Sequence, residues 1–483
     1  MKEIKGFKYV RDSFRTKQVK YGGYAALITL AVIAGLILVN LIIAQFSPQI
    51  DLTQSKLFSL SEQSIQVLDK VTSPVNIYGL WAPGQENTEV TEVVDLYIAR
   101  NKNIHFQAMD PDKNPGFLVR YDKDKQGISR GSVIVEGAKG FKVISSQEMY
   151  DFSTNNQTGA RSVTGVAVER RFTSALLFVG TGETPGLYEI TGHDETALSQ
   201  IGMQEIVERE NFSLKTINLI QSNIPGDASG LIINAPRSDI SRGEADKILA
   251  YLDNGGRLLV LVDYRVRELP ILNEVLSSYG LGFAYGVVQE NDTAHTAGAP
   301  YIMIPEMVEH DITKPLAQKS SLLVLPFPMG ISELSTKRRS VGLSPLLTSS
   351  QNSWLRTDLN ETATVRVGSD IKGPVTIAMA VLDPQYIQGN EKQARIVAIA
   401  AASLLEPISS YQQIPGNLDF FMNSLTWLED RPEALSVRSK SLYLLPLRLN
   451  GLQMIIFGGI FMLIIPLAFF VTGLVTWLKR RHL

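Results

Sequence analysis

The densest group of residues that could do chemistry is His193, Asp194 and Glu195. A histidine beside carboxylates can bind a metal ion or transfer protons. The group follows an expected strand at 187–191, and sites in open α/β sheets gather where strands end. However, no second pair of ligands accompanies it, and residues adjacent in sequence rarely converge on one ion. We favour a structural turn that orients the strand–helix junction, ahead of ligand or partner binding and ahead of catalysis.

Arg237 and Asp239 form a second candidate pair. They follow an expected buried strand at 231–234 and precede an expected helix. In a parallel sheet the ends of neighbouring strands meet at one edge, so this pair should lie near His193. An ion pair and helix cap in a solvated turn is the alternative to ligand or partner binding.

Several chemistries are excluded by what the sequence lacks. It contains no cysteine, so no thiol can act as nucleophile or metal ligand. Neither the G-x-x-x-x-G-K-S/T motif that holds ATP phosphates nor the G-x-S-x-G turn of hydrolases is present. His105, His295 and His310 stand alone. The formal net charge is −2, so nothing suggests a nucleic-acid partner. We therefore expect no enzyme activity, no cofactor and no metal.

Two apolar runs predict the centre of an α/β domain. Continuous apolar strands at 231–234 and 257–262 are typical of a sheet with helices on both faces. Between them, Ser241 and Glu244 have the spacing of a capping box, and a glycine pair ends the helix. Such a strand–helix–strand unit has parallel strands and a right-handed crossover. We assign it to a domain over 187–432.

A smaller α/β domain is expected over 51–180. A strand at 75–80, a helix near 91–100 and a strand near 104–109 follow one another, and a hairpin surrounds Gly137. This order predicts a thioredoxin-like topology. The redox chemistry of that fold is absent because no Cys-x-x-Cys motif is present.

Two uncharged apolar segments, 24–46 and 452–478, predict transmembrane helices. Each is long enough to cross a hydrocarbon core of roughly 30 Å. Lysines and arginines precede the first and follow the second, so both termini should be cytoplasmic and the bulk of the chain extracytoplasmic. A cleaved signal peptide is the alternative for the first segment, and a buried core helix for the second.

The flanks and the second span carry further expectations. Residues 1–23 read as a cytoplasmic basic amphipathic segment, and 479–483 as a cytoplasmic tail. Gly458, Gly459 and Gly473 would let the second span approach the helices of a membrane partner closely.

The order of these features resembles the GldG-like family, the auxiliary membrane subunits of gliding-motility-type ABC transporters. The resemblance covers nearly the whole chain and is carried by an N-terminal span before DLTQSKLFSLSEQS, by YEITGHDE, LIINAPRSDIS, LAYLDNGGRLLVLVD, GPVTIAMAV, ARIVAIA and GNLDFFMNSLTWLED, and by a C-terminal span. One departure stands out, because relatives often carry Gly-Asp where this chain has Ala400 and Ala401. A polar ligand contact at that position is therefore in doubt.

The resemblance implies a noncatalytic extracytoplasmic subunit that works with an ABC permease and a separate ATPase. It also implies a thioredoxin-like domain and a flavodoxin-like or class I glutamine-amidotransferase-like domain. Amidotransferase chemistry would need the cysteine that this chain lacks.

We therefore predict a membrane-anchored α/β protein of the bacterial inner membrane, an auxiliary subunit of an ABC transporter that binds an envelope polysaccharide, a protein substrate or a partner. A membrane-anchored glycan- or peptidoglycan-binding module without a transporter is the second hypothesis. A surface hydrolase that uses the His193 group is the third.

Overall fold

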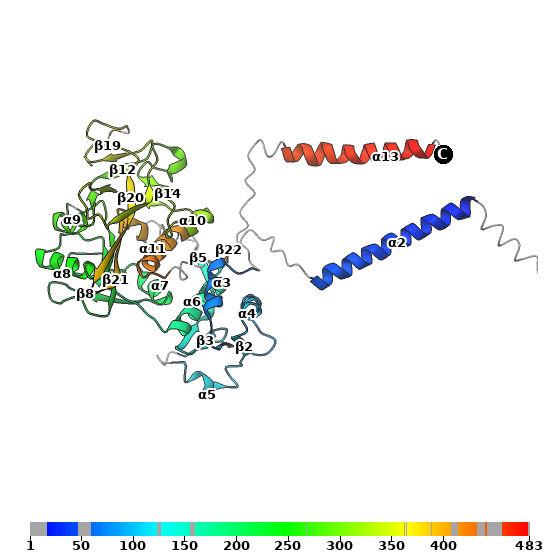
Figure 1. Cartoon of the computed structure of the whole chain (residues 1–483), viewed down its shortest axis with the longest axis horizontal. Coiled ribbons are helices and arrows are strands. Elements are labelled where there is room, and N and C mark those ends of the chain that lie inside the picture. The colour runs from blue at the N-terminus through cyan, green and yellow to red at the C-terminus, as the bar shows by residue number, and fades with distance from the viewer. Residues whose placement is uncertain are drawn as a thin grey trace, which may run out of the picture. The chain divides into compact units, whose positions relative to one another are not determined.

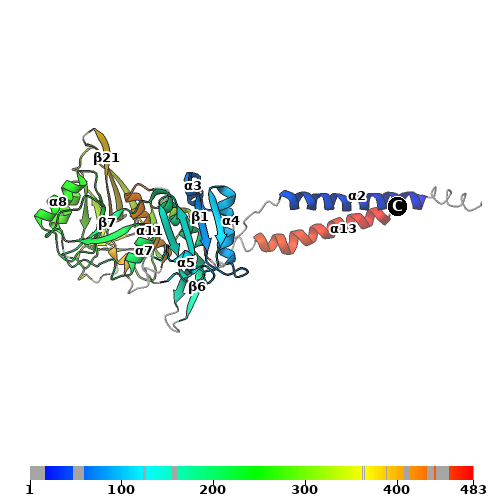
Figure 2. The same ribbon diagram turned by 90° about the horizontal axis from the view of Figure 1, so that it is seen from below.

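The structure is a computed structural model of the chain, shown in Figures 1 and 2. It describes residues 17–46, 59–122, 127–154, 160–266, 268–361, 363, 365–387, 389–406, 414–431, 440–441 and 456–481. The chain divides into two compact units, Met1–Ser59 and Leu60–Leu483, and each is considered by itself. The expected amphipathic segment 1–23 lies outside the described residues over 1–16, and the expected tail lies outside them at 482–483.

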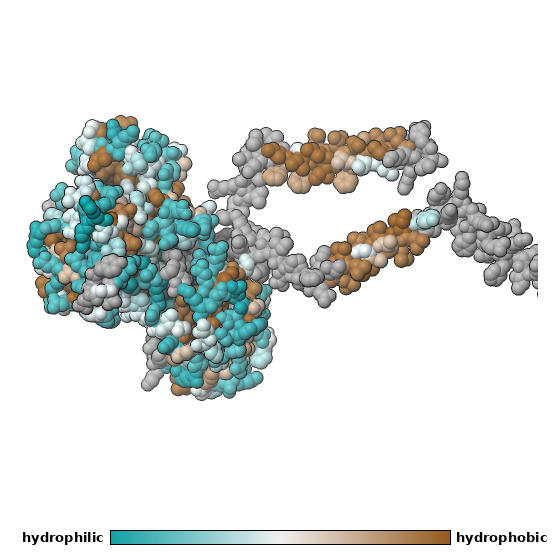
Figure 3. All heavy atoms as spheres, viewed as in Figure 1, coloured by the Kyte–Doolittle hydropathy of each residue, from teal (hydrophilic) through white to brown (hydrophobic). Residues whose placement is uncertain are grey.

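The first unit contains helix α2 (Lys17–Phe46). The part Leu27–Leu41 is a predominantly apolar helical stretch, shorter than a full membrane span. They are exposed, as in Leu27 at 67% and Leu30 at 69%. Figure 3 shows this segment as an apolar stretch in brown. The predicted span 24–46 is therefore helical throughout.

The second unit ends in a long apolar helix. A π-helical turn, η7 (Ile460–Ile464), leads into α13 (Ile465–Arg481). Pro466 lies directly after this turn, where a wider helical turn accommodates a residue that lacks an N–H donor. Within the described ranges, Ile456–Leu478 is the helix long and apolar enough to cross a membrane, and none of it is buried. The start of the predicted span, 452–455, lies outside those ranges.

The first lobe of this unit, residues 60–182, is built on a four-stranded sheet of order β2-β1-β3-β4. β1 runs parallel to β2 and antiparallel to β3, and β3 pairs antiparallel with β4. The strands are β1 (Val75–Gly79), β2 (Ile104–Ala108), β3 (Val133–Gly137) and β4 (Gly140–Ile144). The expected strand–helix–strand and hairpin are thus confirmed as local elements.

Helices pack on one face of this sheet. They are α3 (Glu62–Lys70), α4 (Thr88–Arg100) and α6 (Val168–Thr181). Leu68, Tyr97 and Phe172 of these helices are fully buried against Ile77 of β1, which explains their apolar spacing. Short elements complete the lobe: α5 (Pro115–Leu118), η1 (Ser146–Met149), β5 (Tyr150–Thr154) and β6 (Arg161–Val166), with β22 (Lys440–Ser441) paired to β6.

The second lobe, residues 186–431, is built on a ten-stranded mixed sheet. Its parallel part has the order β8-β7-β9-β10-β21, and antiparallel strands beginning with β20 extend it. The strands are β7 (Gly186–Ile190), β8 (Ser213–Ile217), β9 (Ala228–Asn234), β10 (Arg257–Leu261), β11 (Leu281–Ala284), β14 (Glu306–Met307), β16 (Gly330–Glu333), β17 (Gly342–Thr348), β20 (Thr376–Ile387) and β21 (Asn390–Ile399).

Helices cover both faces of the parallel strands, as the continuous apolar runs predicted. Alternate residues of β9 feed two cores, so that Leu231 and Ile233 join one and Ile232 joins the other. The capping box of Ser241 and Glu244 is present at the start of α8. The helices are α7 (Met203–Arg209) and α11 (Pro415–Leu428) on one face and α8 (Arg242–Leu252) and α9 (Pro270–Ser277) on the other.

Short elements lie between the longer strands of the second lobe. They are β12 (Val287–Gln289), η2 (Thr293–His295), β13 (Ile302–Met303), α10 (Lys314–Gln318), β15 (Leu325–Pro326), β18 (Trp354–Arg356), β19 (Ile371–Lys372) and η3 (Ala402–Leu405). The protein is thus of mixed α/β class, as the sequence predicted.

Candidate functional site

His193 lies in the connection after β7, at the carboxyl end of the parallel strands. Its ring is buried, with Nδ1 at 3.0 Å from Oε1 of Glu195 and Nε2 at 3.1 Å from Oε2 of Glu244. The two nitrogens point apart, so the carboxylates lie on different sides of the ring and do not converge on one ion. A doubly protonated ring donates to both carboxylates, whereas a neutral ring donates to one.

Glu244 ties this turn to helix α8. Its Oε2 also accepts hydrogen bonds from the backbone and the hydroxyl of Ser241, both at 2.8 Å. Burial alone would raise the pKa of Glu244, but the hydrogen bonds from Ser241 and the neighbouring His193 ring hold that pKa below its ordinary value. The capping box that the sequence predicted thus has a second role, because its glutamate also anchors a histidine 51 residues away.

The rest of the His193 turn is occupied by internal hydrogen bonds. The backbone amides of Gly192 and His193 donate to Glu195, and the amides of Arg237 and Ser238 donate to the carbonyl of His193. Asp194 has a left-handed backbone with φ of 57°, which aspartate tolerates better than most residues. This geometry fits the favoured interpretation, a turn that orients a strand–helix junction.

Arg237 and Asp239 lie beside this turn but do not pair with each other. The carboxylate of Asp239 accepts from the amides of Ile271 at 2.6 Å and Leu272 at 3.0 Å, and so caps the start of α9. Arg237 instead faces Asp263 at the end of β10, with Nη2 and Oδ2 3.7 Å apart. The alternative considered from the sequence was an ion pair and a helix cap within this turn, whereas Asp239 caps α9 and Arg237 faces a different acid, Asp263.

Other side chains at this edge, which the sequence did not suggest, also satisfy one another. Arg265 forms an ion pair with the buried Asp263 and another with Glu406. Beside it, the ring of Tyr264 stacks on Phe327, which stacks on Tyr301, each pair with centroids 4.7 Å apart. Ala400 and Ala401, where relatives often carry Gly-Asp, are buried and contribute no polar side chain. Most polar side chains at the carboxyl edge are therefore paired within the chain, although the buried Oδ1 of Asn234 and Oε1 of Glu244 accept no hydrogen bond from the described residues.

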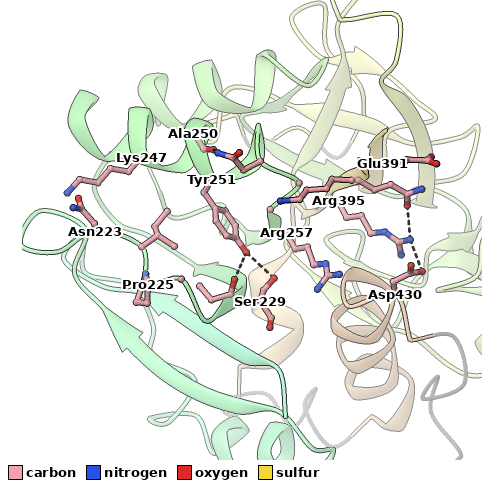
Figure 4. Close-up of a pocket in the computed structure, with 18 residues that line it drawn as sticks. Asn223, Pro225, Ser229, Lys247, Ala250, Tyr251, Arg257, Glu391, Arg395 and Asp430 are labelled. Carbon is pink, nitrogen blue, oxygen red and sulfur yellow. Dashed lines mark hydrogen bonds and ion pairs between the residues drawn. The ribbon is translucent and has the colours of Figure 1, made fainter. Parts of the chain in front are cut away.

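A cavity lies at the opposite, amino end of the parallel strands. It has a volume of about 950 Å³ and lies between the ends of α8 and the starts of β9, β10 and β21. Figure 4 shows Lys247 and Asn223 at one end, Arg395 and Asp430 at the other, and Tyr251 between them. The Tyr251 hydroxyl donates to the carbonyl of Ser229 at 2.9 Å, and burial raises its pKa to about 12.

Two arginines stand side by side in the cavity wall, because Arg257 and Arg395 occupy paired positions on neighbouring parallel strands. Arg257 forms an ion pair with the buried Glu429. Arg395 donates to the carbonyl of Trp427 at 2.6 Å and to Asp430 at 2.7 Å. Burial raises the pKa of Glu429, and Arg257 opposes that shift. The sequence feature that could have indicated this wall is a basic residue, Arg257, at the start of an otherwise apolar strand.

The glycines of the long apolar helix Ile456–Leu478 have open space around them. A Cβ atom added at Gly458, Gly459 or Gly473 would meet nothing within 4 Å in the described part of the chain. This leaves room for close approach by another helix but does not identify one.

The fold and these sites define a class: a mixed α/β protein that carries an exposed apolar helix of membrane-spanning length. A family model described as an ABC-type uncharacterized transport system matches residues 177–424, just over half of the 483 residues. The chain therefore belongs to this family of ABC transport auxiliary proteins, and its role is an auxiliary one associated with an ABC transport system. A second model, of a domain of unknown function, matches 54–150. The search among curated proteins found no match.

Solved structures resemble this chain only distantly. The N-terminal domain of mmIFT52 is 14% identical with a TM-score of 0.36, and the alignment covers 50% of this chain and 96% of that domain. A ThuA-like protein from Bacteroides uniformis is 15% identical with a TM-score of 0.31, covering 51% and 92%. An exo-β-1,4-mannosidase from an Opitutaceae bacterium is 9% identical with a TM-score of 0.26, covering 72% and 49%. Scores this low carry no functional argument.

Proposed function

We propose that this protein is a noncatalytic auxiliary subunit of a bacterial ABC transporter of the gliding-motility type. The observation that carries the proposal is the family match over 177–424 in a chain that also bears the exposed apolar helix Ile456–Leu478. The closed His193 turn supports a noncatalytic role, because both ring nitrogens already face carboxylates. The partners would be an ABC permease and a separate ABC ATPase.

Two helices would anchor the protein in the inner membrane. The exposed apolar side chains of both helices need lipid or a protein partner to cover them. With 24–46 as a first span and 452–478 as a second, the basic flanks would place both termini in the cytoplasm and both lobes outside. Gly458, Gly459 and Gly473 would then contact permease helices.

The two lobes would present the extracytoplasmic surface to an envelope substrate or partner. The strand order β2-β1-β3-β4 with an antiparallel hairpin supports a thioredoxin-like assignment for the first lobe. The order β8-β7-β9-β10-β21 supports a flavodoxin-like assignment for the second, a topology it would share with amidotransferase-like domains. His193, Asp194, Glu195, Arg237 and Asp239 stay a predicted binding edge, although their internal bonds favour a structural role.

Copurification tests the proposal. The full-length chain, extracted from its native membrane in mild detergent, should bring with it a permease and an ATPase that carries a Walker A motif. Gly459→Leu should reduce recovery of the permease by blocking close helix contact. Met462→Leu, at a residue 85% exposed on the same helix, is the matched control and should not.

Recovery of the chain alone or as a homo-oligomer, in several detergents, would contradict the transporter proposal. The membrane-anchored glycan- or peptidoglycan-binding module would then lead. Retention of the full chain on insoluble peptidoglycan would support that second function, and no retention on any glycan would remove it.

A further inference from the structure

We propose that the cavity at the amino ends of β9, β10 and β21 binds a small molecule bearing carboxylate or phosphate groups. Its volume of about 950 Å³ lies at the upper end of the range for small-molecule sites. Its lining is largely polar, because charged and amide side chains face it from several elements (Figure 4). The inference concerns the second lobe alone and does not depend on the proposed transporter role.

Hydrogen-bond donors exceed acceptors among the charged groups of this cavity. Lys247 donates to the carbonyls of Leu219 at 2.6 Å and Ser222 at 2.9 Å, which leaves one of its three N–H groups and its whole charge without an acid partner. Arg257 has five N–H groups and uses one nitrogen for Glu429. Backbone carbonyls thus position a lysine charge at the cavity wall without neutralising it.

Lys392 supplies a second uncompensated charge. Its side chain is exposed, lines the cavity and forms no hydrogen bond or ion pair within the described ranges. Its neighbour Glu391 also lines the cavity, but its carboxylate points away from Tyr251 in Figure 4. Arg395 and Asp430 neutralise each other, so the remaining charged side chains of the lining are the two lysines, Lys247 and Lys392, against the single acid Glu391.

Two of the three acids near the cavity are occupied by its arginines, and the third, Glu391, forms no ion pair within the described ranges. Glu429 is buried behind Arg257, and Asp430 binds Arg395. An anionic ligand would supply an acid partner for Lys247 and Lys392, which have none within the described ranges. Because Tyr251 donates its hydroxyl to the backbone carbonyls of Ala228 and Ser229, its ring is held in place in the cavity wall.

The test is ligand binding to the purified full-length chain in detergent, measured by calorimetry with three probes: inorganic phosphate, citrate, and glucose as an uncharged control. Phosphate or citrate should bind and glucose should not. Lys392→Gln should weaken binding about tenfold, because a charge-assisted hydrogen bond is lost. Lys372→Gln, which removes an equally exposed lysine outside the cavity, is the matched control and should bind like the wild type.

The outcomes separate the sources of the anion. Binding of phosphate alone assigns a phosphoryl group, and binding of citrate alone assigns a carboxylate; either supports the site. Affinity should fall as salt rises from about 50 to 500 mM, because screening weakens exposed charges. The inference is overturned if neither anion binds below about 10 mM, if glucose binds equally well, or if Lys392→Gln binds the anions as tightly as the wild type. None of these results bears on copurification with a permease.

Discussion

The two ends of the parallel sheet in the second lobe are built differently. At the carboxyl end, His193, Asp239 and Asp263 are each satisfied by a partner in the same chain. At the amino end, a cavity of about 950 Å³ is lined by Lys247 and Lys392, whose charges have no acid partner in the described part of the chain. Polar residues are thus abundant at both ends of the sheet, but only the amino end has charged side chains left without an acid partner for a ligand to contact.

This difference shows why the usual position of ligand sites in α/β sheets does not predict where a ligand would bind in this protein. Ligands of open α/β sheets generally bind at the carboxyl ends of the strands. In this protein that edge is closed by capping, ion pairs and stacked rings, among them Tyr264 and Phe327. We therefore expect the charged residues at the carboxyl end to contribute mainly to stability, and Lys247 and Lys392 at the amino end to contribute mainly to binding. The following predictions test that division.

The largest effect is expected at His193. His193→Ala leaves the buried Glu195 and Glu244 facing a void without their shared partner. Removing one member of such a buried network should cost about 3 kcal/mol, or a fall in Tm of roughly 6–12 °C. Thermal melting of the full chain in detergent measures it. Asp194→Asn, which keeps a residue tolerant of the left-handed backbone, should melt within about 2 °C of the wild type.

If His193→Ala melts like the wild type, the carboxyl edge is not a structural network, and its residues become free to serve a ligand.

A smaller loss is expected at Asp239. Asp239→Ala removes the acceptor for two amides at the start of α9 and should cost about 1 kcal/mol. Asp239→Asn keeps a capping oxygen and should recover most of this loss. The comparison is made by thermal melting. Equal melting of the two variants would argue against capping and would restore Asp239 as a binding candidate.

The pH dependence of Glu429 probes the amino end. Burial raises its pKa above the ordinary 4.5, so the folded protein binds this proton more tightly than the unfolded chain. Its contribution to stability is present below 4.5 and is lost as pH rises through the raised pKa. Glu429→Gln should therefore show a smaller loss of Tm than the wild type between about pH 4 and pH 7. If Tm changes with pH in the same way for both proteins, the prediction is wrong, and the ion pair with Arg257 fully offsets the cost of burying the Glu429 carboxylate.

The smallest effect on stability is expected at Lys392. Because its side chain is exposed and has no partner within the described ranges, Lys392→Gln should change stability by less than about 0.5 kcal/mol. Its effect should appear in anion binding instead. A large drop in Tm for this variant, measured without ligand, would mean that the amino end is also a structural network and would remove the contrast.

Local patterns predicted the elements of this fold well. The apolar runs at 231–234 and 257–262 are buried strands, and Ser241 with Glu244 forms the capping box that their spacing indicated. The second apolar segment forms a helix that can cross a membrane over Ile456–Leu478. The first is helical, with a shorter apolar stretch at Leu27–Leu41. Resemblance also led to the ABC transport auxiliary family, which the family match confirms, while the GldG-like assignment stays a prediction.

The candidate site could be predicted only in part. The sequence predicted that His193 and Arg237 lie at one edge of the sheet. In the structure the backbone amide of Arg237 donates a hydrogen bond to the carbonyl of His193. The sequence did not indicate Glu244 as the second partner of His193, Asp263 as the partner of Arg237, or a cavity at the opposite edge. The extension of the parallel sheet by the antiparallel β20 also had no local signal.

The sequence by itself determined where helices and strands form, which segments are apolar enough for a membrane, and which chemistries are absent. These depend on periodicity, capping and composition within a few residues of each position. The tertiary structure alone decided which charges are neutralised and which stay available. Arg257 meets Glu429 across 172 residues, whereas Lys392 meets no acid in the described part of the chain. Such pairings depend on strand order and register, which bring distant residues together and leave no local trace in the sequence.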